Sequence, residues 1–259
     1  MQTLRTHFIA YFDILGYKAE MRKNEQLFFV KNIIGMFSFH KGMNTLYKTM
    51  MDMPEKLIKY QQGLIGYKLF SDNFILYVPE TGEKKTDIFN LALLIDACLN
   101  IQCHFCRTGL KVRGVISRGN LYADEYFVFG SGLVNAVVKE EQINFPIIGI
   151  DDIMEKYDEV SQLIQIRETG KRLKHLDFLE YYYKRYETDK KHEKIISMLH
   201  CHSKLIDSTP FKRKTMAKRM FLIIYHNEFC DRHGFESQKH KYSLVEKLYK
   251  VYFRLVWRI

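Results

Sequence analysis

The chain has 259 residues, of which 47% are hydrophobic and 27% charged, a composition that excludes a disordered chain and suits one large domain or a domain with an extension. It contains no run of 18 or more uncharged apolar residues and no signal-peptide pattern, so we expect a cytoplasmic protein without membrane insertion. The net charge of +10 favours anionic partners, although most of the surplus lies in residues 151–259, where both signs alternate as on solvated helix faces.

In residues 1–150, strand-like and helix-like segments follow one another. Short apolar runs bounded by turn residues predict strands at 7–13, 64–70, 74–78, 111–117, 126–129 and 145–150. Apolar residues at three- and four-residue steps predict helices at 86–106 and 130–141 and two more between 24 and 62. The order β-α-α-β-β-α-β-β-α-β is an elaborated β-α-β-β-α-β unit. We therefore predict an α+β, ferredoxin-like fold, with a split antiparallel sheet and the helices on one face.

Beyond residue 151 the pattern changes, because strand-like runs nearly vanish. Helices are expected at about 173–186, 190–207, 213–232 and 242–257. We therefore predict a mixed domain over 1–150 and a helical extension over 151–259. A stripe of Tyr249, Phe253 and Trp257 favours a buttressing role for the extension over a sensing role.

Five cysteines at irregular spacing exclude a disulfide framework. Cys103 and Cys106 form a C-x-x-C, but no second ligand pair completes a tetrahedral zinc site, so two small residues on a helix are favoured. His200, Cys201 and His202 are consecutive in a predicted helix and would point to different sides, which disfavours a ligand set. His226 and Asn227 are interpreted as a buried, hydrogen-bonded cap rather than a catalytic dyad.

Two aspartates fall at linked positions of this topology. The first strand ends in Asp13, and Asp72 stands just before the strand that pairs antiparallel with it, so both carboxylates reach the same rim of the sheet. Like charges held close are costly unless a cation offsets them. Two divalent ions at such a rim suit an in-line phosphoryl displacement. The following turn, Ile14–Tyr17, contains Gly16, which lets backbone amides approach phosphate oxygens.

Four segments resemble signatures of the class III adenylate and guanylate cyclases, in the order of that family. They are Phe12–Tyr17 (F-D-I-L-G-Y), Lys68–Asp72 (K-L-F-S-D), Val112–Gly119 (V-R-G-V-I-S-R-G) and Gly130–Ala136 (G-S-G-L-V-N-A). The resemblance covers residues 8–150. It implies that residues 1–150 are a nucleotide cyclase catalytic domain.

The resemblance also implies a set of site residues. Asp13, Asp72 and the backbone carbonyl of Ile14 would hold two Mn²⁺ or Mg²⁺ ions, and the amides of Ile14, Leu15, Gly16 and Tyr17 would hold the triphosphate of a nucleoside triphosphate. The ribose 3′-hydroxyl would attack the α-phosphate and expel pyrophosphate. Sites of this family lie at a dimer interface, so a homodimer is expected.

The sequence departs from the purine cyclases at the residues that read the base and stabilise the transition state. The base-reading positions hold Lys68 and Phe127, and Phe127 cannot bond an exocyclic amine. Val134 and Val138 occupy the usual asparagine and arginine positions. Arg113, Arg118, Lys139 and the neighbouring Asn135 are therefore the candidates for charge stabilisation.

These departures, with the Leu133–Glu140 helix, resemble the pyrimidine cyclases of bacterial Pycsar anti-phage defence. The resemblance implies synthesis of cyclic UMP or cyclic CMP, with UTP favoured over CTP, and a separately encoded effector that responds to the product.

Two other functions remain open. One is a catalytically silent cyclase-like module that binds a nucleotide or a partner, motivated by Val134 and Val138. The other is a nucleic-acid-binding protein on a ferredoxin-like sheet, motivated by the net charge. The strand aromatics alternate like core residues, so nucleic acid is not the expected partner.

Overall fold

A computed structural model describes residues 4–28, 65–70, 72–151, 156–157, 160, 166–169, 173–187, 192–209, 213–241 and 250. Its strands are β1 (Arg5–Leu15), β2 (Gly66–Phe70), β3 (Asn73–Pro79), β4 (Lys111–Ala123), β5 (Val128–Phe129), β6 (Ile148–Ile150), β7 (Ile166–Thr169) and β8 (Leu173–Leu176). Its helices are α1 (Tyr17–Lys23), α2 (Glu25–Phe28), α5 (Lys84–Thr108), α6 (Ser131–Glu141), α9 (Phe178–Glu187), α10 (His192–Asp207), α11 (Arg213–His233) and the short η2 (Glu236–Gln238).

The sheet runs in the order β2-β3-β1-β4-β6-β8-β7, with β5 paired to β4. The neighbouring strands β2, β3, β1 and β4 pair antiparallel, and their order in the sheet is that of a ferredoxin-like β-α-β-β-α-β unit. The α+β class and the ferredoxin-like core are thus confirmed. The sheet is mixed rather than purely antiparallel, because β6 lies parallel to β4.

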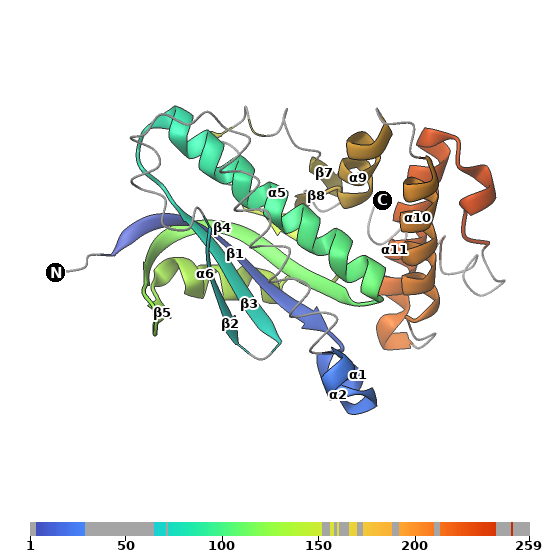
Figure 1. Cartoon of the computed structure of the whole chain (residues 1–259), viewed down its shortest axis with the longest axis horizontal. Helices are drawn as coiled ribbons and strands as arrows, with labels where there is room; N and C mark the ends of the chain where they lie inside the picture. Colours follow the sequence, from blue (N-terminus) through green and yellow to red (C-terminus); the bar gives the residue numbers. More distant parts are fainter. Residues whose placement is uncertain are drawn as a thin grey trace.

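The long helix α5 covers one face of the sheet (Figure 1). Phe12 of β1 stacks on Phe74 of β3 with ring centroids 4.5 Å apart, and Phe74 contacts Phe105 of α5 at 6.0 Å. Gly109 ends the helix at φ 81°, a left-handed conformation that glycine adopts without a Cβ clash. By length and composition α5 is the one described helix that could cross a membrane, but most of its apolar stretch is buried in this core.

The helix α6 packs on the opposite face, which corrects the expectation of helices on one face. A Cβ built on Gly132 of α6 would lie 2.5 Å from the Ile9 side chain. Ile9 and Phe12 are three residues apart on β1, so they point to opposite sides of the sheet. The two faces are therefore covered by α5 and α6.

The sheet continues past residue 151, where a purely helical extension was predicted. β8 pairs antiparallel with β6, and β7 with β8, so 173–176 is a strand instead of the start of a helix. The helices expected at 190–207 and 213–232 are confirmed as α10 and α11, whereas most of 24–62, and 242–257 with its aromatic stripe, fall outside the described residues except for isolated positions.

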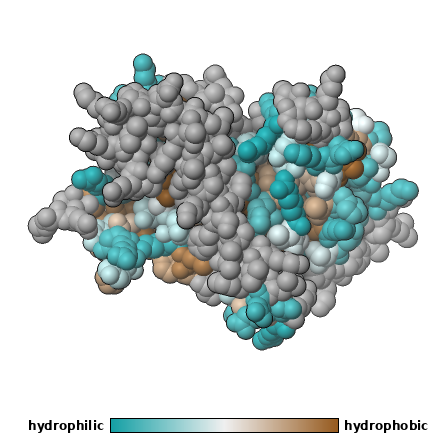
Figure 2. Space-filling model, in the orientation of Figure 1, coloured by the Kyte–Doolittle hydropathy of each residue, from teal (hydrophilic) through white to brown (hydrophobic). Residues whose placement is uncertain are grey.

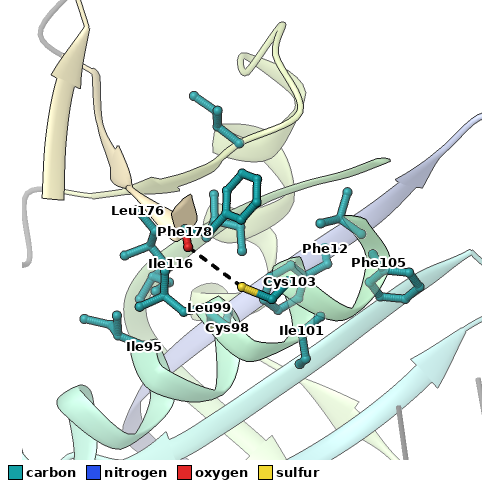
Figure 3. Close-up of a cluster of buried hydrophobic side chains, with 14 of the residues drawn as sticks. Phe12, Ile95, Cys98, Leu99, Ile101, Cys103, Phe105, Ile116, Leu176 and Phe178 are labelled. Carbon is teal, nitrogen blue, oxygen red and sulfur yellow. Dashed lines mark hydrogen bonds between the residues drawn. The ribbon is translucent and has the colours of Figure 1, made fainter. Parts of the chain in front are cut away.

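The C-terminal helices pack on α5. Figure 3 shows Cys103 of α5 donating to the backbone carbonyl of Phe178 at 3.8 Å, within a cluster of buried apolar side chains from both parts. Arg107 of α5 donates to the Tyr182 hydroxyl at 2.6 Å, and Tyr181 donates to Asp96 of α5 at 2.6 Å. The core thus extends without a break from the sheet into the C-terminal part.

Candidate active site

Asp13 lies near the C-terminal end of β1, between two strands that supply its neighbours. It is in register with Asn73 of β3 on one side and Arg113 of β4 on the other. Asp72 precedes Asn73, and its carbonyl accepts a hydrogen bond from the Ile14 amide at 3.1 Å. The predicted juxtaposition of the Asp13 and Asp72 backbones at one rim is therefore confirmed.

Arg113 connects this rim to α6. Its guanidinium lies 3.4 Å from the Asp13 carboxylate and forms an ion pair with Glu140, which is buried at the C-terminal end of α6. It also donates to the backbone carbonyl of Ile143 at 3.1 Å. One cation thus bridges two carboxylates on the α6 side of the sheet.

The electrostatics of Asp13 follow from this arrangement. Burial raises the pKa of the Asp13 carboxyl, the Arg113 charge lowers it, and the charge of Asp72 raises it further. Burial likewise raises the pKa of Glu140 against the opposing effect of Arg113. The site therefore holds more negative charge than Arg113 alone offsets.

The donor set fits a hard divalent cation. Mg²⁺ and Mn²⁺ prefer carboxylate and carbonyl oxygens, and two mutually repelling carboxylates at a half-buried rim gain from a cation between them. Among the residues that the structure describes, no group of three or more His, Cys, Asp or Glu side chains has metal-binding geometry. A metal here would be held by Asp13, Asp72 and the Ile14 carbonyl, and ligands from outside the protein would complete its coordination.

The turn after Asp13 is shorter than predicted. Ile14 and Leu15 still belong to β1, and only Gly16, at φ 83°, turns the chain into α1, which begins at Tyr17. The Ile14 amide already donates to the Asp72 carbonyl. It is therefore committed to the sheet, which removes it from the predicted phosphate-binding amides.

Arg118 does not lie at the site. It is opposite Phe8, five residues along β1 from Asp13, or about 17 Å at the usual strand rise. There it forms a hydrogen bond from Nε to Glu80 at 2.7 Å. Lys156 at 2.9 Å and the Tyr157 hydroxyl at 2.8 Å complete this cluster, which lowers the pKa of Glu80 to about 2. Within one protomer, Arg118 therefore lies away from the Asp13 rim, and its catalytic role stays a prediction.

The α6 candidates lie on the outer side of that helix. Asn135, Val134 and Val138 are exposed. Asn135 precedes Glu140 by five residues, or about 7.5 Å of helix rise. Lys139 forms an ion pair with Asp151. None of these four is among the groups that surround Asp13 within the described structure.

The two predicted base-reading residues are brought together. Lys68 of β2 donates to the backbone carbonyl of Glu125 at 2.5 Å, in the loop that leads to Phe127. Asp124 shapes this loop, because its carboxylate accepts from the amides of Tyr126 and Phe127 at 2.8 and 2.7 Å. Phe127 remains 65% exposed, so its ring is available to a ligand or a partner.

The other sequence candidates are structural. Cys98, Cys103 and Cys106 are buried free thiols on α5, and burial raises the pKa of Cys103 to about 12. His202 and His226 stack inside the C-terminal part with their Nδ1 atoms 3.1 Å apart, as a buried bonded pair rather than a ligand set. These placements agree with the interpretation of Cys103 and Cys106 as residues packed on a helix and of His226 as part of a buried, hydrogen-bonded group.

Two charged residues near Asp13 were not assigned from the sequence. Glu140 belongs to the Leu133–Glu140 segment. The sequence of this helix alone does not show that Glu140 is buried, because its partner Arg113 lies on a separate strand. Lys218 comes from α11, far along the chain, and its charge interacts with those of Asp13, Glu140 and Arg113. No local pattern in the sequence points to that long-range charge interaction.

Comparison with known proteins gives matches to solved structures alone, since no protein-family model and no curated protein matches. The monomeric guanylyl cyclase domain of the RhoGC fusion protein from the aquatic fungus Blastocladiella emersonii is 6% identical, with a TM-score of 0.45, over 67% of this chain and 95% of that one. The adenylate/guanylate cyclase/hydrolase from Silicibacter pomeroyi is 14% identical (TM-score 0.41; 68% and 96% covered). The guanylyl cyclase Cya2 is 10% identical (TM-score 0.39; 64% and 84%). All three structural neighbours are named as nucleotide cyclases.

Proposed function

We propose that the chain is a metal-dependent nucleotide cyclase that converts a pyrimidine nucleoside triphosphate into its 3′,5′-cyclic monophosphate and pyrophosphate. The observation that carries the proposal is the placement of Asp13 beside Asp72 at one rim of the sheet, with Arg113 on the other side of Asp13. The four motif resemblances in residues 8–150 supply the reaction type. As expected from the sequence, we place the protein in the cytoplasm.

The chemistry assigned to the chain is positioning and charge compensation. Bound Mg²⁺ or Mn²⁺ would offset the phosphate charge and favour ionisation of the 3′-hydroxyl. The hydroxyl oxygen bonds to the α-phosphorus, the bond from that phosphorus to the pyrophosphate oxygen breaks, and the hydroxyl proton passes to water. Asp13 and Asp72 would hold the cations, and Arg113 holds Asp13 in place through Glu140 and Ile143.

The choice of a pyrimidine rests on Lys68 and Phe127. The Lys68 ammonium lies beside the loop that presents Phe127, so these two residues offer a donor and an apolar ring, and the Phe127 side chain offers no acceptor. Cytosine and uracil each carry the O2 carbonyl that a lysine can bond. We favour UTP over CTP, and we expect the cyclic product to act on a separately encoded effector in antiviral defence, as the motif resemblance implies.

The decisive experiment incubates the purified protein with each of the four nucleoside triphosphates and Mn²⁺, and identifies products by mass-resolved chromatography. Cyclic UMP or cyclic CMP is expected, with a loss of about 100-fold or more in Asp13→Asn and in Asp72→Asn. Asp207→Asn, which changes an exposed carboxylate of α10, is the matched control and retains activity. A cyclic purine product would show that the pyrimidine assignment is wrong, whereas the proposed cyclisation reaction would stand.

A homodimer is part of the proposal. Seven apolar side chains on β2, the β4–β5 hairpin and α6 are 46% to 78% exposed: Tyr67, Phe70, Tyr126, Phe127, Phe129, Val134 and Val138. We call them the exposed apolar surface; Figure 2 shows apolar atoms exposed at the lower edge of the face that it draws. Monomers rarely expose large apolar patches, so a second copy is a fitting occupant.

Light scattering after size-exclusion chromatography tests the dimer. Tyr126→Asp and Val138→Asp are each expected to shift the mass to that of a monomer and to reduce turnover. Ile196→Asp introduces the same charge at a similarly exposed apolar residue of α10 and leaves the dimer intact. A wild-type protein that is monomeric at all concentrations would remove the dimer from the proposal.

The second candidate is a silent nucleotide-binding module. The observation that favours it is that valines occupy both exposed positions of α6 where the related cyclases carry asparagine and arginine. Calorimetric binding of a nucleoside triphosphate, without pyrophosphate release from any of the four, would select this candidate.

A further inference from the structure

The helix α11 reaches the candidate active site from the C-terminal part of the chain. Phe221 of α11 stacks on Phe145 with ring centroids 4.6 Å apart and an interplanar angle of 16°. Phe145 follows Ile143, whose carbonyl accepts a hydrogen bond from Arg113. In Figure 1, α11 lies at the end of the sheet toward which the C-terminal end of β1 points. The segment 143–145 therefore lies between α11 and the site.

Lys218 is the charged residue that α11 directs toward this site. It precedes Phe221 by three residues, so the two lie on the same side of the helix. The Lys218 side chain is half-buried, and its charge attracts those of Asp13 and Glu140 and repels that of Arg113. Burial and Arg113 together lower the pKa of its ammonium, and the two carboxylates oppose that shift.

Arg113 and Lys218 differ in how firmly other groups of the protein hold their side chains. Arg113 is held by three groups: the carboxylates of Asp13 and Glu140 and the carbonyl of Ile143. It is anchored, and reorienting it would strand the buried Glu140. Lys218 acts on the same groups through its charge, and it carries three rotatable donors on a flexible stem.

The charge count of the site also points to an anionic ligand. Asp13, Asp72 and Glu140 are offset by Arg113 and Lys218, which leaves one net negative charge among these groups when all are ionised. Two divalent cations would reverse that sign, and the resulting positive site would match the charge of a polyphosphate. Without Lys218, the same site would bind the polyphosphate less tightly, and most of the loss would appear in substrate affinity.

We propose that Lys218 binds the phosphate chain of the substrate, so that the C-terminal part completes the site built on β1, β3 and β4. This inference rests on the proposed function for the identity of the substrate as a nucleoside triphosphate. It assigns to Lys218 a direct contact with non-bridging phosphate oxygens, which a lysine ammonium bonds as a compact charge. It also gives the extension a role in substrate binding besides buttressing.

The test measures binding and turnover in the full-length protein. Calorimetry with inorganic tripolyphosphate and Mg²⁺ gives affinity independently of cyclisation, and initial rates with the preferred nucleoside triphosphate give kcat and KM. Lys218→Met keeps the aliphatic stem and removes the charge. It is expected to weaken tripolyphosphate binding by about tenfold to 100-fold and to raise KM by a similar factor. Lys218→Arg is expected to restore most of the affinity.

The controls separate this proposal from a structural role and from the proposed function itself. Lys204→Met, at an exposed position of α10, leaves affinity and KM unchanged. Urea unfolding of Lys218→Met establishes that the protein is folded in the assay. Wild-type affinity for tripolyphosphate in folded Lys218→Met would overturn the proposal. If the wild type cyclises no nucleotide but binds tripolyphosphate through Lys218, the proposed reaction fails while the phosphate site stands.

Discussion

At the scale of single residues, Arg113 connects Asp13 of the candidate site to the rest of the fold. Its guanidinium bridges Asp13 on the sheet and the buried Glu140 on α6, so it links the rim of the candidate site to the helix behind it. A buried carboxylate that loses the cation bonded to it is costly, because it retains its desolvation penalty. Arg113 is therefore expected to contribute to stability through Glu140 and to position Asp13 in the proposed active site.

Arg113→Ala is expected to lower the free energy of unfolding by about 3 kcal/mol, because Glu140 stays buried and loses the guanidinium bonded to it. Urea denaturation at pH 7 measures the change. Lys139→Ala breaks a neighbouring but more exposed pair, with Asp151, and should cost less than about 1 kcal/mol. The double variant Arg113→Ala/Glu140→Ala should regain part of the loss, and a strictly additive result would contradict this account.

Glu80 makes the stability of the folded protein depend on pH in the acidic range. Its pKa is about 2 in the folded protein, below its ordinary value, because Arg118, Lys156 and Tyr157 bond the carboxylate. The stabilisation is present above pH 4.5 and is lost as the pH falls through about 2. Since Arg118 and Lys156 are partly exposed, we expect ionised Glu80 to contribute about 1–2 kcal/mol to the free energy of unfolding. Glu80→Gln should remove this amount at pH 7 and little at pH 2, as measured by unfolding across pH.

At the scale of elements, α6 and β4 touch backbone to backbone. A Cβ on Gly119 would lie 2.5 Å from the Cα of Gly132, and a Cβ on Gly132 would lie 2.8 Å from the carbonyl carbon of Gly119. Two glycines at one crossing thus set the separation between the helix and the sheet. That separation fixes how far Glu140, at the other end of α6, lies from Arg113.

Gly119→Ala is expected to push α6 from the sheet, to cost about 1–3 kcal/mol and to reduce turnover. Unfolding curves and initial rates measure the two effects. Gly82→Ala is the control: it meets no atom within 4 Å, so its cost is limited to the backbone strain at φ 85°, and turnover is retained. Full activity in Gly119→Ala would show that the α6 spacing does not matter to the site.

At the scale of the whole molecule, the sheet and the C-terminal helices share one core. Phe145 stacks on Phe221, and the polar bonds of Arg107 and Asp96 tie α5 to α9. Asp177 at the start of α9 accepts from the Tyr225 hydroxyl of α11 at 2.5 Å, inside the fold. Parts joined by such contacts are expected to unfold together.

Phe221→Ala is expected to destabilise the entire chain by about 3–4 kcal/mol, because it opens a cavity between the two parts. Fluorescence and circular dichroism should follow a single, coincident transition in the variant as in the wild type. Met216→Ala, which truncates a buried residue in the first turn of α11, provides a comparison from within the same helix. Two separate transitions in the wild type would contradict the shared core.

The parts of this architecture that the sequence predicted are those with a local signature. The apolar run of β1 and the stripe of α5 each bury their residues in a short window, so periodicity reveals them, and the turn at Asp72 is marked by its residue types. The short strands β7 and β8 were missed because charged residues such as Arg167, Glu168 and Lys174 interrupt any strand pattern. The charge interaction of Lys218 with the site was missed because only tertiary packing brings α11 near Asp13.

The buried thiols of α5 allow local opening of the chain to be measured by chemical labelling. A thiol reacts with alkylating reagents as the thiolate, so Cys98, Cys103 and Cys106 stay inert while the layers above and below them remain closed. Cys201 of α10 is partly accessible and should label first. Timed alkylation followed by peptide mass spectrometry therefore ranks local openings by free energy, residue by residue, without a probe being added to the protein.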